Sequence, residues 1–187
     1  MAVDLVPAEH ASWLAPLLPG PPERPAASPE GLMELAIAIS AANPRRGGGP
    51  FGAVVADAGG RILALGWNDV VPSCDSTAHA EIVALRRAQR ALGTHDLAAA
   101  GRLVLYASCA PCIQCFGALW WSGVKVVRSA ATRADAEAAG FREGPVGPEL
   151  WAAAERERGL RHEPGFGAAA RAAAVLAAWR RAGGEVY

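Results

Sequence analysis

Two short segments of the sequence combine side chains that bind a transition metal with one that can move protons. His79 and Glu81 lie in a His-Ala-Glu segment, and Cys112 and Cys115 lie in a Pro-Cys-Ile-Gln-Cys segment. Residues three apart share one face of a helix, so both thiols can point at one metal ion. Amides at a helix start favour the thiolate form that a metal needs. One imidazole and two thiolates leave one position of a zinc ion open for water, which is the arrangement of catalytic zinc sites.

Glu81 lies close enough to His79 in the sequence to reach the water on the metal without being a ligand itself. Zinc lowers the pKa of its bound water to about 7. We expect Glu81 to accept a proton from this water and to return it to the substrate and its leaving group. The predicted chemistry is therefore hydrolysis with Glu81 as the proton carrier.

The cysteines also allow two other interpretations. A Cys-x-x-Cys pair occurs in redox proteins, although a redox pair has no need of a nearby His-Ala-Glu segment. A structural zinc site takes a fourth Cys or His ligand, for which Cys109 and Cys74 are available. The chain would then be a non-catalytic zinc module that binds a partner.

The segments that must position these residues alternate between helical and extended patterns. Residues 78–92 and 111–121 are predicted helices that begin at the metal-binding segments, and Pro111 suits a first helical position. A hydroxyl cap at Ser28 predicts a helix that Asn43-Pro44 ends, because the residue before a proline is pushed out of helical geometry. Strands are predicted from apolar runs at 51–56, 62–67, 103–107 and 124–128, and further helices at 132–139, 148–158 and 168–181. This alternation indicates an α/β layered sheet.

The first part of the chain differs in composition from the rest. Residues 1–29 are rich in proline and are predicted to form an N-terminal arm that is extended on the surface or partly disordered. Residues 30–187 are long enough for a single domain with one core, and it ends in a helical C-terminal segment.

Composition disfavours several classes of protein. Lys plus Arg and Asp plus Glu both number 18, and this zero net charge disfavours a nucleic-acid binder. No apolar run is long enough to cross a membrane, and the start of the chain lacks the pattern of a secretory signal. Cysteines packed closely in such a chain favour metal binding over disulfides. We therefore expect a cytoplasmic protein with a small-molecule substrate.

A His-x-Glu segment followed by Pro-Cys-x-x-Cys is the general signature of zinc deaminases. Around these residues the sequence resembles the cytidine deaminase superfamily, and most of all the bacterial guanine deaminases and their relatives that act on ammeline. The resemblance extends over about residues 48–143 and more loosely to the C-terminus. It is carried by residues 48–53, 68, 77–81, 108–109, 111–112, 117–118, 121 and 139–141.

The resemblance implies a three-layer α/β/α fold with a mixed five-stranded sheet, a zinc cofactor and a homodimer. It also implies hydrolytic deamination of an amino-heterocycle, with guanine converted to xanthine and ammonia as the leading expectation. Deamination of ammeline, cytosine, a nucleoside or a specialised modified base is the alternative. Deamination of adenosine in tRNA is disfavoured by the zero net charge.

The same resemblance implies roles for further residues. Asn68 matches the asparagine that hydrogen-bonds the base, and Glu143 matches a second acid that helps to shuttle protons. Substrate contacts are also expected from Phe51, Ala80, Trp121 and Tyr187.

Two positions depart from the family pattern. Ala110 stands where Glu usually precedes Pro-Cys, and Gln114 stands where Met often precedes the second cysteine. Neither change removes a ligand or the proton carrier. Both are expected to alter the pocket floor or the groups that support the metal ligands.

Overall fold

The computed structural model describes residues 5–19 and 26–187 and shows one mixed sheet of five strands. The strands lie in the order β2-β1-β3-β4-β5, with β1 antiparallel to both of its neighbours and the β3–β4 and β4–β5 pairs parallel. Their bounds are β1 (Gly52–Asp57), β2 (Ile62–Trp67), β3 (Leu103–Cys109), β4 (Val126–Ala131) and β5 (Arg161–Pro164). The expected mixed five-stranded sheet is confirmed.

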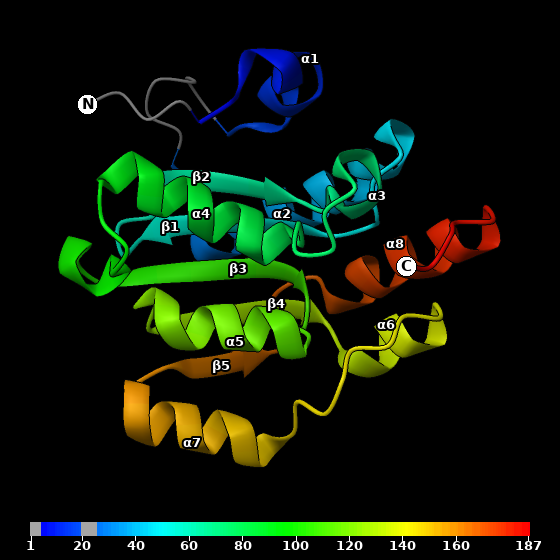
Figure 1. Ribbon diagram of the computed structural model, residues 1–187. Helices are drawn as coiled ribbons and strands as arrows, with labels where there is room; N and C mark the ends of the chain where they lie inside the picture. The colour runs from blue at the N-terminus through cyan, green and yellow to red at the C-terminus, as the bar shows by residue number, and fades with distance from the viewer. Residues whose placement is uncertain (1–4, 20–25) are drawn as a thin grey trace.

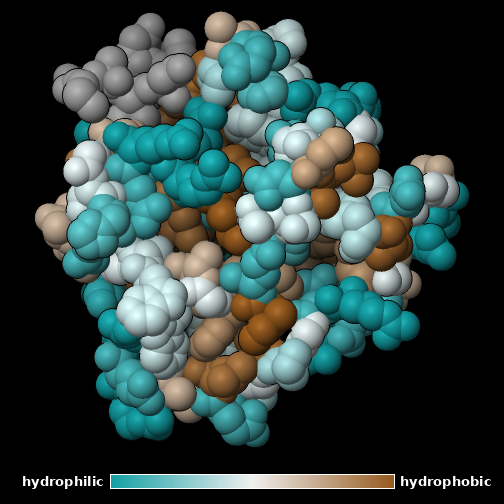
Figure 2. Space-filling view, viewed as in Figure 1, coloured by the Kyte–Doolittle hydropathy of each residue, from teal (hydrophilic) through white to brown (hydrophobic). Residues whose placement is uncertain are grey.

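Helices cover both faces of the sheet, which confirms the three-layer α/β/α fold (Figure 1). One face carries α4 (Ala80–Leu92), α5 (Ile113–Ser122) and α7 (Pro148–Arg158), and the other carries α2 (Pro29–Ala42) and α8 (Ala169–Arg181), with α6 (Arg133–Ala138) beside α8. Side chains of β1 alternate between the two core clusters, with Val55 in one and Val54 in the other. Figure 2 shows that apolar atoms on this side of the molecule lie mostly in recesses between hydrophilic side chains.

The end of α2 differs from its prediction in a way that affects the site. The Ser28 hydroxyl accepts a hydrogen bond from Gly31 N at 3.2 Å and caps the helix as expected. Asn43, however, keeps helical dihedral angles (φ −59°, ψ −36°) although Pro44 follows it. The chain continues as a short 3-10 helix, η3 (Asn43–Arg46), and leaves helical geometry at Gly47, whose φ of 82° suits glycine. The proline therefore does not push Asn43 out of helical geometry.

Two predicted helices begin later than their patterns indicate. His79 and Cys112 have extended dihedral angles and are the N-cap residues of α4 and α5, so both metal-binding segments lie at helix boundaries. The predicted loop at 70–77 contains one helical turn, α3 (Val70–Ser73), and a further 3-10 turn, η4 (Leu97–Ala100), precedes β3. The prediction of helices alone after residue 132 is wrong, because β5 separates α7 from α8.

The described part of the N-terminal arm is not extended. It folds into the short turns η1 (Ala8–His10), α1 (Ala11–Leu14) and η2 (Ala15–Leu17). Leu14 is fully buried, and the ring of Trp13 packs edge-on at 5.7 Å from that of Trp67. The burial of these apolar side chains overrides the composition of the segment, whereas the prolines at 21, 22 and 25 lie outside the described residues.

Within residues 5–19 and 26–187, no helix is both long enough and apolar enough to cross a membrane.

Candidate active site

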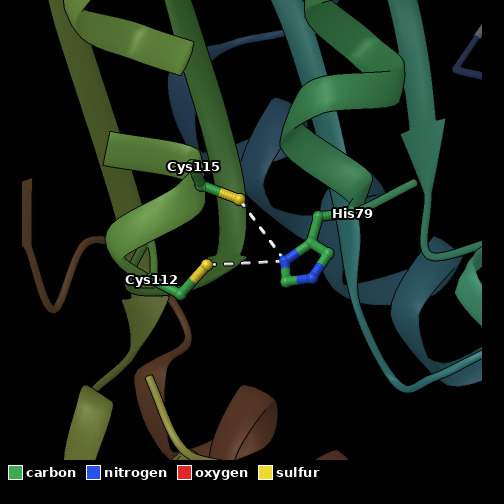
Figure 3. A group of neighbouring side chains, drawn as sticks. All are labelled: His79, Cys112 and Cys115. Atoms are coloured by element: carbon green, nitrogen blue, oxygen red, sulfur yellow. Dashed lines mark hydrogen bonds between the residues drawn. The ribbon is translucent and has the colours of Figure 1, made fainter. Parts of the chain in front are cut away.

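The three predicted metal ligands point toward one another where α4 and α5 begin (Figure 3). His79 Nδ1 lies 3.4 Å from Cys112 Sγ and 3.6 Å from Cys115 Sγ, and the three ligand atoms lie within 4.8 Å of one another. A tetrahedral zinc ion with ordinary bond lengths to nitrogen and sulfur separates such atoms by about 3.6 Å. The spacing of the three side chains therefore fits a zinc ion.

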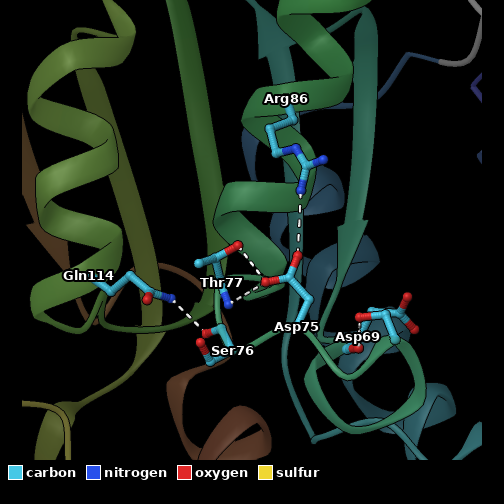
Figure 4. A network of polar contacts seen from close by, with 7 residues as sticks. Asp69, Asp75, Ser76, Thr77, Arg86 and Gln114 are labelled. Atoms are coloured by element: carbon cyan, nitrogen blue, oxygen red, sulfur yellow. Dashed lines mark hydrogen bonds and ion pairs between the residues drawn. The ribbon is translucent and has the colours of Figure 1, made fainter.

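Backbone contacts of the 75–79 loop position His79. Asp75 Oδ1 accepts hydrogen bonds from Thr77 N at 2.8 Å and Thr77 Oγ1 at 2.7 Å, and His79 N donates to Thr77 O at 2.8 Å. Gln114 on α5 donates from Nε2 to Ser76 O at 3.1 Å (Figure 4). Gln114, one of the two departures from the family pattern, thus joins the loop that carries the histidine to the helix that carries the cysteines.

The two thiols differ in acidity. A hydrogen bond from Cys115 lowers the pKa of Cys112 to about 4. The same hydrogen bond, together with burial, raises the pKa of Cys115 well above its usual value. Burial alone would lower the pKa of His79, but the hydrogen bond with Cys112 and the nearby Glu81 raise it overall. The metal-free site therefore holds one thiolate and one thiol at neutral pH.

Glu81 lies in the first turn of α4 and is 8% exposed. Burial, with the charge of Cys112, raises the pKa of its carboxyl to about 7. It lines the same cavity as His79 and Cys112 but is not part of the metal-binding group. A carboxyl with this pKa can both accept and release a proton near neutral pH.

The cavity above the metal-binding residues has a volume of about 210 Å³. Pockets for drug-sized ligands have volumes of about 300–1,000 Å³, so this cavity suits a smaller molecule. Of the predicted substrate contacts, Asn68, Phe51 and Tyr187 line it, and so does Glu143, the predicted second acid. Ala110, the other departure from the family pattern, also lines it.

Hydrogen bonds orient the two polar residues on the cavity wall. Asn68 is 1% exposed, and its Oδ1 accepts from Gly49 N at 3.2 Å and Val70 N at 3.4 Å. Its Nδ2 is then the atom that can donate into the cavity. The carbonyl oxygen of Glu143 accepts from Ile113 N at 2.9 Å, which joins this residue to the start of α5. Burial, with the charge of Cys112, raises the pKa of the Glu143 carboxyl to about 7.

Aromatic rings form the apolar part of the wall. Phe51 and Tyr187 both pack edge-on against Phe141, at 4.8 and 5.6 Å between ring centroids. A Cβ on Gly49 would collide with the Tyr187 hydroxyl, so only glycine at this position leaves room for the Tyr187 ring. The sequence predicts no role in the site for Phe141, although residues 139–141 are among those that carry the family resemblance.

Two predicted substrate contacts do not line the cavity. Trp121 is 74% exposed, and Cζ of Arg158 lies over its ring, 4.5 Å from the ring centroid. It stands nine residues beyond Cys112, or about 13 Å along the helix axis, so it does not line the cavity of its own chain, and its role in shaping a pocket stays a prediction. The Ala80 side chain is fully buried in the core beneath α4 instead of facing the cavity.

The remaining cysteines do not complete a four-ligand site. Cys74 is exposed and adopts a left-handed conformation with φ 54°, while Cys109 is buried with its Sγ 3.5 Å from Thr132 O. In the described part of the chain, neither belongs to the metal-binding group. Three protein ligands beside a cavity are the arrangement of a catalytic rather than a structural zinc ion.

The sequence model of the cytidine and deoxycytidylate deaminase zinc-binding region matches residues 27–131. The chain belongs to this deaminase family. Membership confirms the expected class of enzyme, a zinc-dependent hydrolase that acts on carbon–nitrogen bonds, and agrees with the geometry of His79, Cys112 and Cys115.

Two guanine deaminases are among the most similar proteins. The guanine deaminase of Bacillus subtilis (strain 168) is 40% identical over 122 residues, which are 65% of this chain and 76% of that protein. The structure of a guanine deaminase from Nitrosomonas europaea is 38% identical with a TM-score of 0.80, and the match covers 88% of this chain and 95% of that one. A tRNA-specific adenosine deaminase of Buchnera aphidicola subsp. Schizaphis graminum is 37% identical over 93 residues, 50% of this chain and 59% of that protein.

Proposed function

We propose that this chain deaminates guanine to xanthine and ammonia. The observation that carries the proposal is one small cavity in which the metal-binding residues, the buried carboxyl of Glu81 and the oriented amide of Asn68 meet. Similarity to two guanine deaminases, one of them along nearly the whole chain, supports the choice of base.

Glu81 carries protons between water and the substrate in this reaction. His79, Cys112 and Cys115 would hold the zinc ion, which when bound acidifies water and acts as a Lewis acid. A carboxylate oxygen of Glu81 takes a proton from the attacking water and passes it to a ring nitrogen of the base. The same carboxylate then takes the second proton of that water, from the new hydroxyl on C2, and delivers it to the departing amine. A C2–O bond forms, the C2–N bond breaks, and ammonia leaves.

The other residues of the wall select and hold the base. Asn68 Nδ2 would donate to an acceptor on the ring edge, because its Oδ1 is already engaged by backbone amides. Glu143, with a pKa raised to about 7, would accept a hydrogen bond from the ring edge and assist proton transfer. Phe51 and Tyr187 would cover the faces of the ring. A volume of about 210 Å³ favours a free base over a nucleoside.

Ammonia release from the zinc-loaded protein tests the proposal. Guanine, guanosine, ammeline, cytosine, cytidine and adenosine are compared at equal concentration, with Glu81→Gln as the inactive control. We expect guanine to give the highest kcat/KM. No ammonia from any of the six would refute deamination of these compounds, and a preference for a nucleoside or a single-ring base would refute guanine as the substrate.

We also propose that the protein is a homodimer in the cytoplasm. Along α5, Ile113 is 44% exposed and Trp121 is 74% exposed, and nothing lies within 4 Å of a Cβ built on Gly117 between them. This apolar strip lies on the helix that carries both cysteine ligands, so a second copy on it would shield the cavity. The reducing cytoplasm would keep the four cysteines free of disulfide bonds. Sedimentation should give the mass of two chains, and Trp121→Glu should give one.

A further inference from the structure

A buried asparagine outside the cavity, Asn43, joins the glycine loop at residues 47–49 to Asn68 on the cavity wall. Asn43 is the residue that directly follows α2, and it is 1% exposed. Its Nδ2 donates to the carbonyl oxygen of Gly49 at 2.9 Å and to that of Asn68 at 2.6 Å. Both hydrogens of this amide are therefore used to connect the glycine loop to the residue expected to bind the base.

The glycine at position 48 fits the same arrangement. A Cβ on Gly48 would collide with both Asn43 Nδ2 and the carbonyl oxygen of Asn68. Glycine therefore allows the Asn43 amide to approach this closely. On the other side of the loop, Gly49 donates its N–H to Asn68 Oδ1. Asn68 is thus held at its main-chain carbonyl by Asn43 and at its side-chain carbonyl by Gly49.

The other polar atom of the Asn43 side chain, Oδ1, indicates why the residue is polar. Within the described residues, Asn43 Oδ1 is buried without a hydrogen-bond partner. An unpaired buried oxygen destabilises the fold, and a leucine of similar shape would avoid it. An asparagine at this position has the two hydrogen bonds donated by Nδ2, which leucine cannot form.

We propose that Asn43 is a positioning residue that aims the amide of Asn68 into the cavity and thereby determines the affinity for the base. The inference rests on the proposed function, in which Asn68 contacts the substrate. Asn43 does not line the cavity itself, so it acts through Asn68.

A double-mutant cycle with the zinc-loaded protein and guanine tests this role. Asn43→Leu keeps the shape of the side chain and removes both donors. Misalignment of one hydrogen bond weakens binding by about tenfold, so KM should rise by about that factor. The kcat value and the zinc content should change by less than about twofold, and in an Asn68→Ala background KM should also change by less than about twofold.

Ser40→Ala is the matched control, because Ser40 is buried in α2 one turn earlier and its hydroxyl donates within the helix to Ile37 O at 2.7 Å. Its KM should equal that of the unaltered protein. If Asn43→Leu does not fold, Gly48→Ala disturbs the same contact from the opposite side and should raise KM in the same way.

Three results would overturn the inference: an unchanged KM in Asn43→Leu, a rise that persists in full in the Asn68→Ala background, or an equal rise in Ser40→Ala. An unaltered KM in Asn68→Ala alone would remove the proposed role of Asn68 and the inference with it. That outcome leaves guanine deamination itself standing, since the proposed function is tested by the comparison of substrates with the unaltered protein.

Discussion

Zinc binding to the metal-free protein at pH 7 should release more than one proton. Zinc binds thiolates and neutral imidazole, so every proton on a ligand must leave. Cys112, with a pKa lowered to about 4, is already a thiolate and releases none. Cys115, whose pKa is raised well above the usual value by its hydrogen bond with Cys112 and by burial, releases one. His79, whose pKa is raised above 6.5, is partly protonated and releases part of another.

Titration calorimetry measures this number directly. The protein is stripped with a chelator and titrated with zinc in two buffers of different ionisation enthalpy, and the difference in heat gives the protons released. The apparent association constant should fall as the pH falls, because protons compete with the metal for the same atoms. The slope should be at least about one power of ten per pH unit, because it equals the number of protons released.

Other cysteines of the chain provide the controls. Cys74→Ser changes an exposed cysteine outside the metal-binding group and should release the same number of protons. Cys115→Ser should lose tight zinc binding. Release of no protons, or zinc affinity in Cys115→Ser equal to that of the unaltered protein, would refute the ligand assignment and the reasoning from pKa values.

Three further predictions concern the acids and the core. Glu81→Gln should keep one zinc ion per chain while guanine turnover falls by about 10²–10⁴-fold, and retained turnover would show that another group moves the proton. Because burial raises the pKa of Glu143 from 4.5 to about 7, the metal-free protein gains stability from protonation below pH 4.5 and loses it as the pH rises through about 7. Calorimetric melting across this range should show a flatter decline for Glu143→Gln, and equal slopes would contradict the raised pKa. Leu119→Ala, at a position 1% exposed, should lower the free energy of unfolding in urea by about 2–5 kcal/mol, whereas Leu150→Ala, at 36% exposed, should cost less than half as much.

The metal ligands and the proton carrier could be predicted from sequence because their chemistry constrains local spacing. Two thiolates three residues apart at a helix start can reach one ion, and Cys112 and Cys115 do so with Cys112 as the N-cap residue of α5. The conformation of the caps could not be predicted in this way. His79 and Cys112 adopt extended angles at helix starts anchored by neighbouring loops, through bonds such as that from Ile113 N to Glu143 O.

Features that depend on tertiary packing could not be predicted from the sequence. The edge strand β5 reads Arg-His-Glu-Pro and has no apolar periodicity, so only its pairing with β4 reveals it. Trp121 follows Leu119 by two residues, which places it about 200° further round the helix axis. Because Leu119 is buried against the sheet, Trp121 faces away from it. No local sequence pattern indicates which face of α5 packs against the sheet.

The structure separates the groups for hydrolysis from the groups expected to choose the substrate. His79, Cys112 and Glu81 belong to helix starts supported by the 75–79 loop and α5. Asn68 and Glu143 lie on other segments, held by their own hydrogen bonds to the glycine loop and to Ile113 N. Asn68 bonds to Gly49 N and Val70 N and to neither helix start, so its substitution can move the recognition wall without altering the ligand geometry. Changes of preferred heterocycle among related deaminases should then arise from the wall, while zinc affinity follows the helix starts.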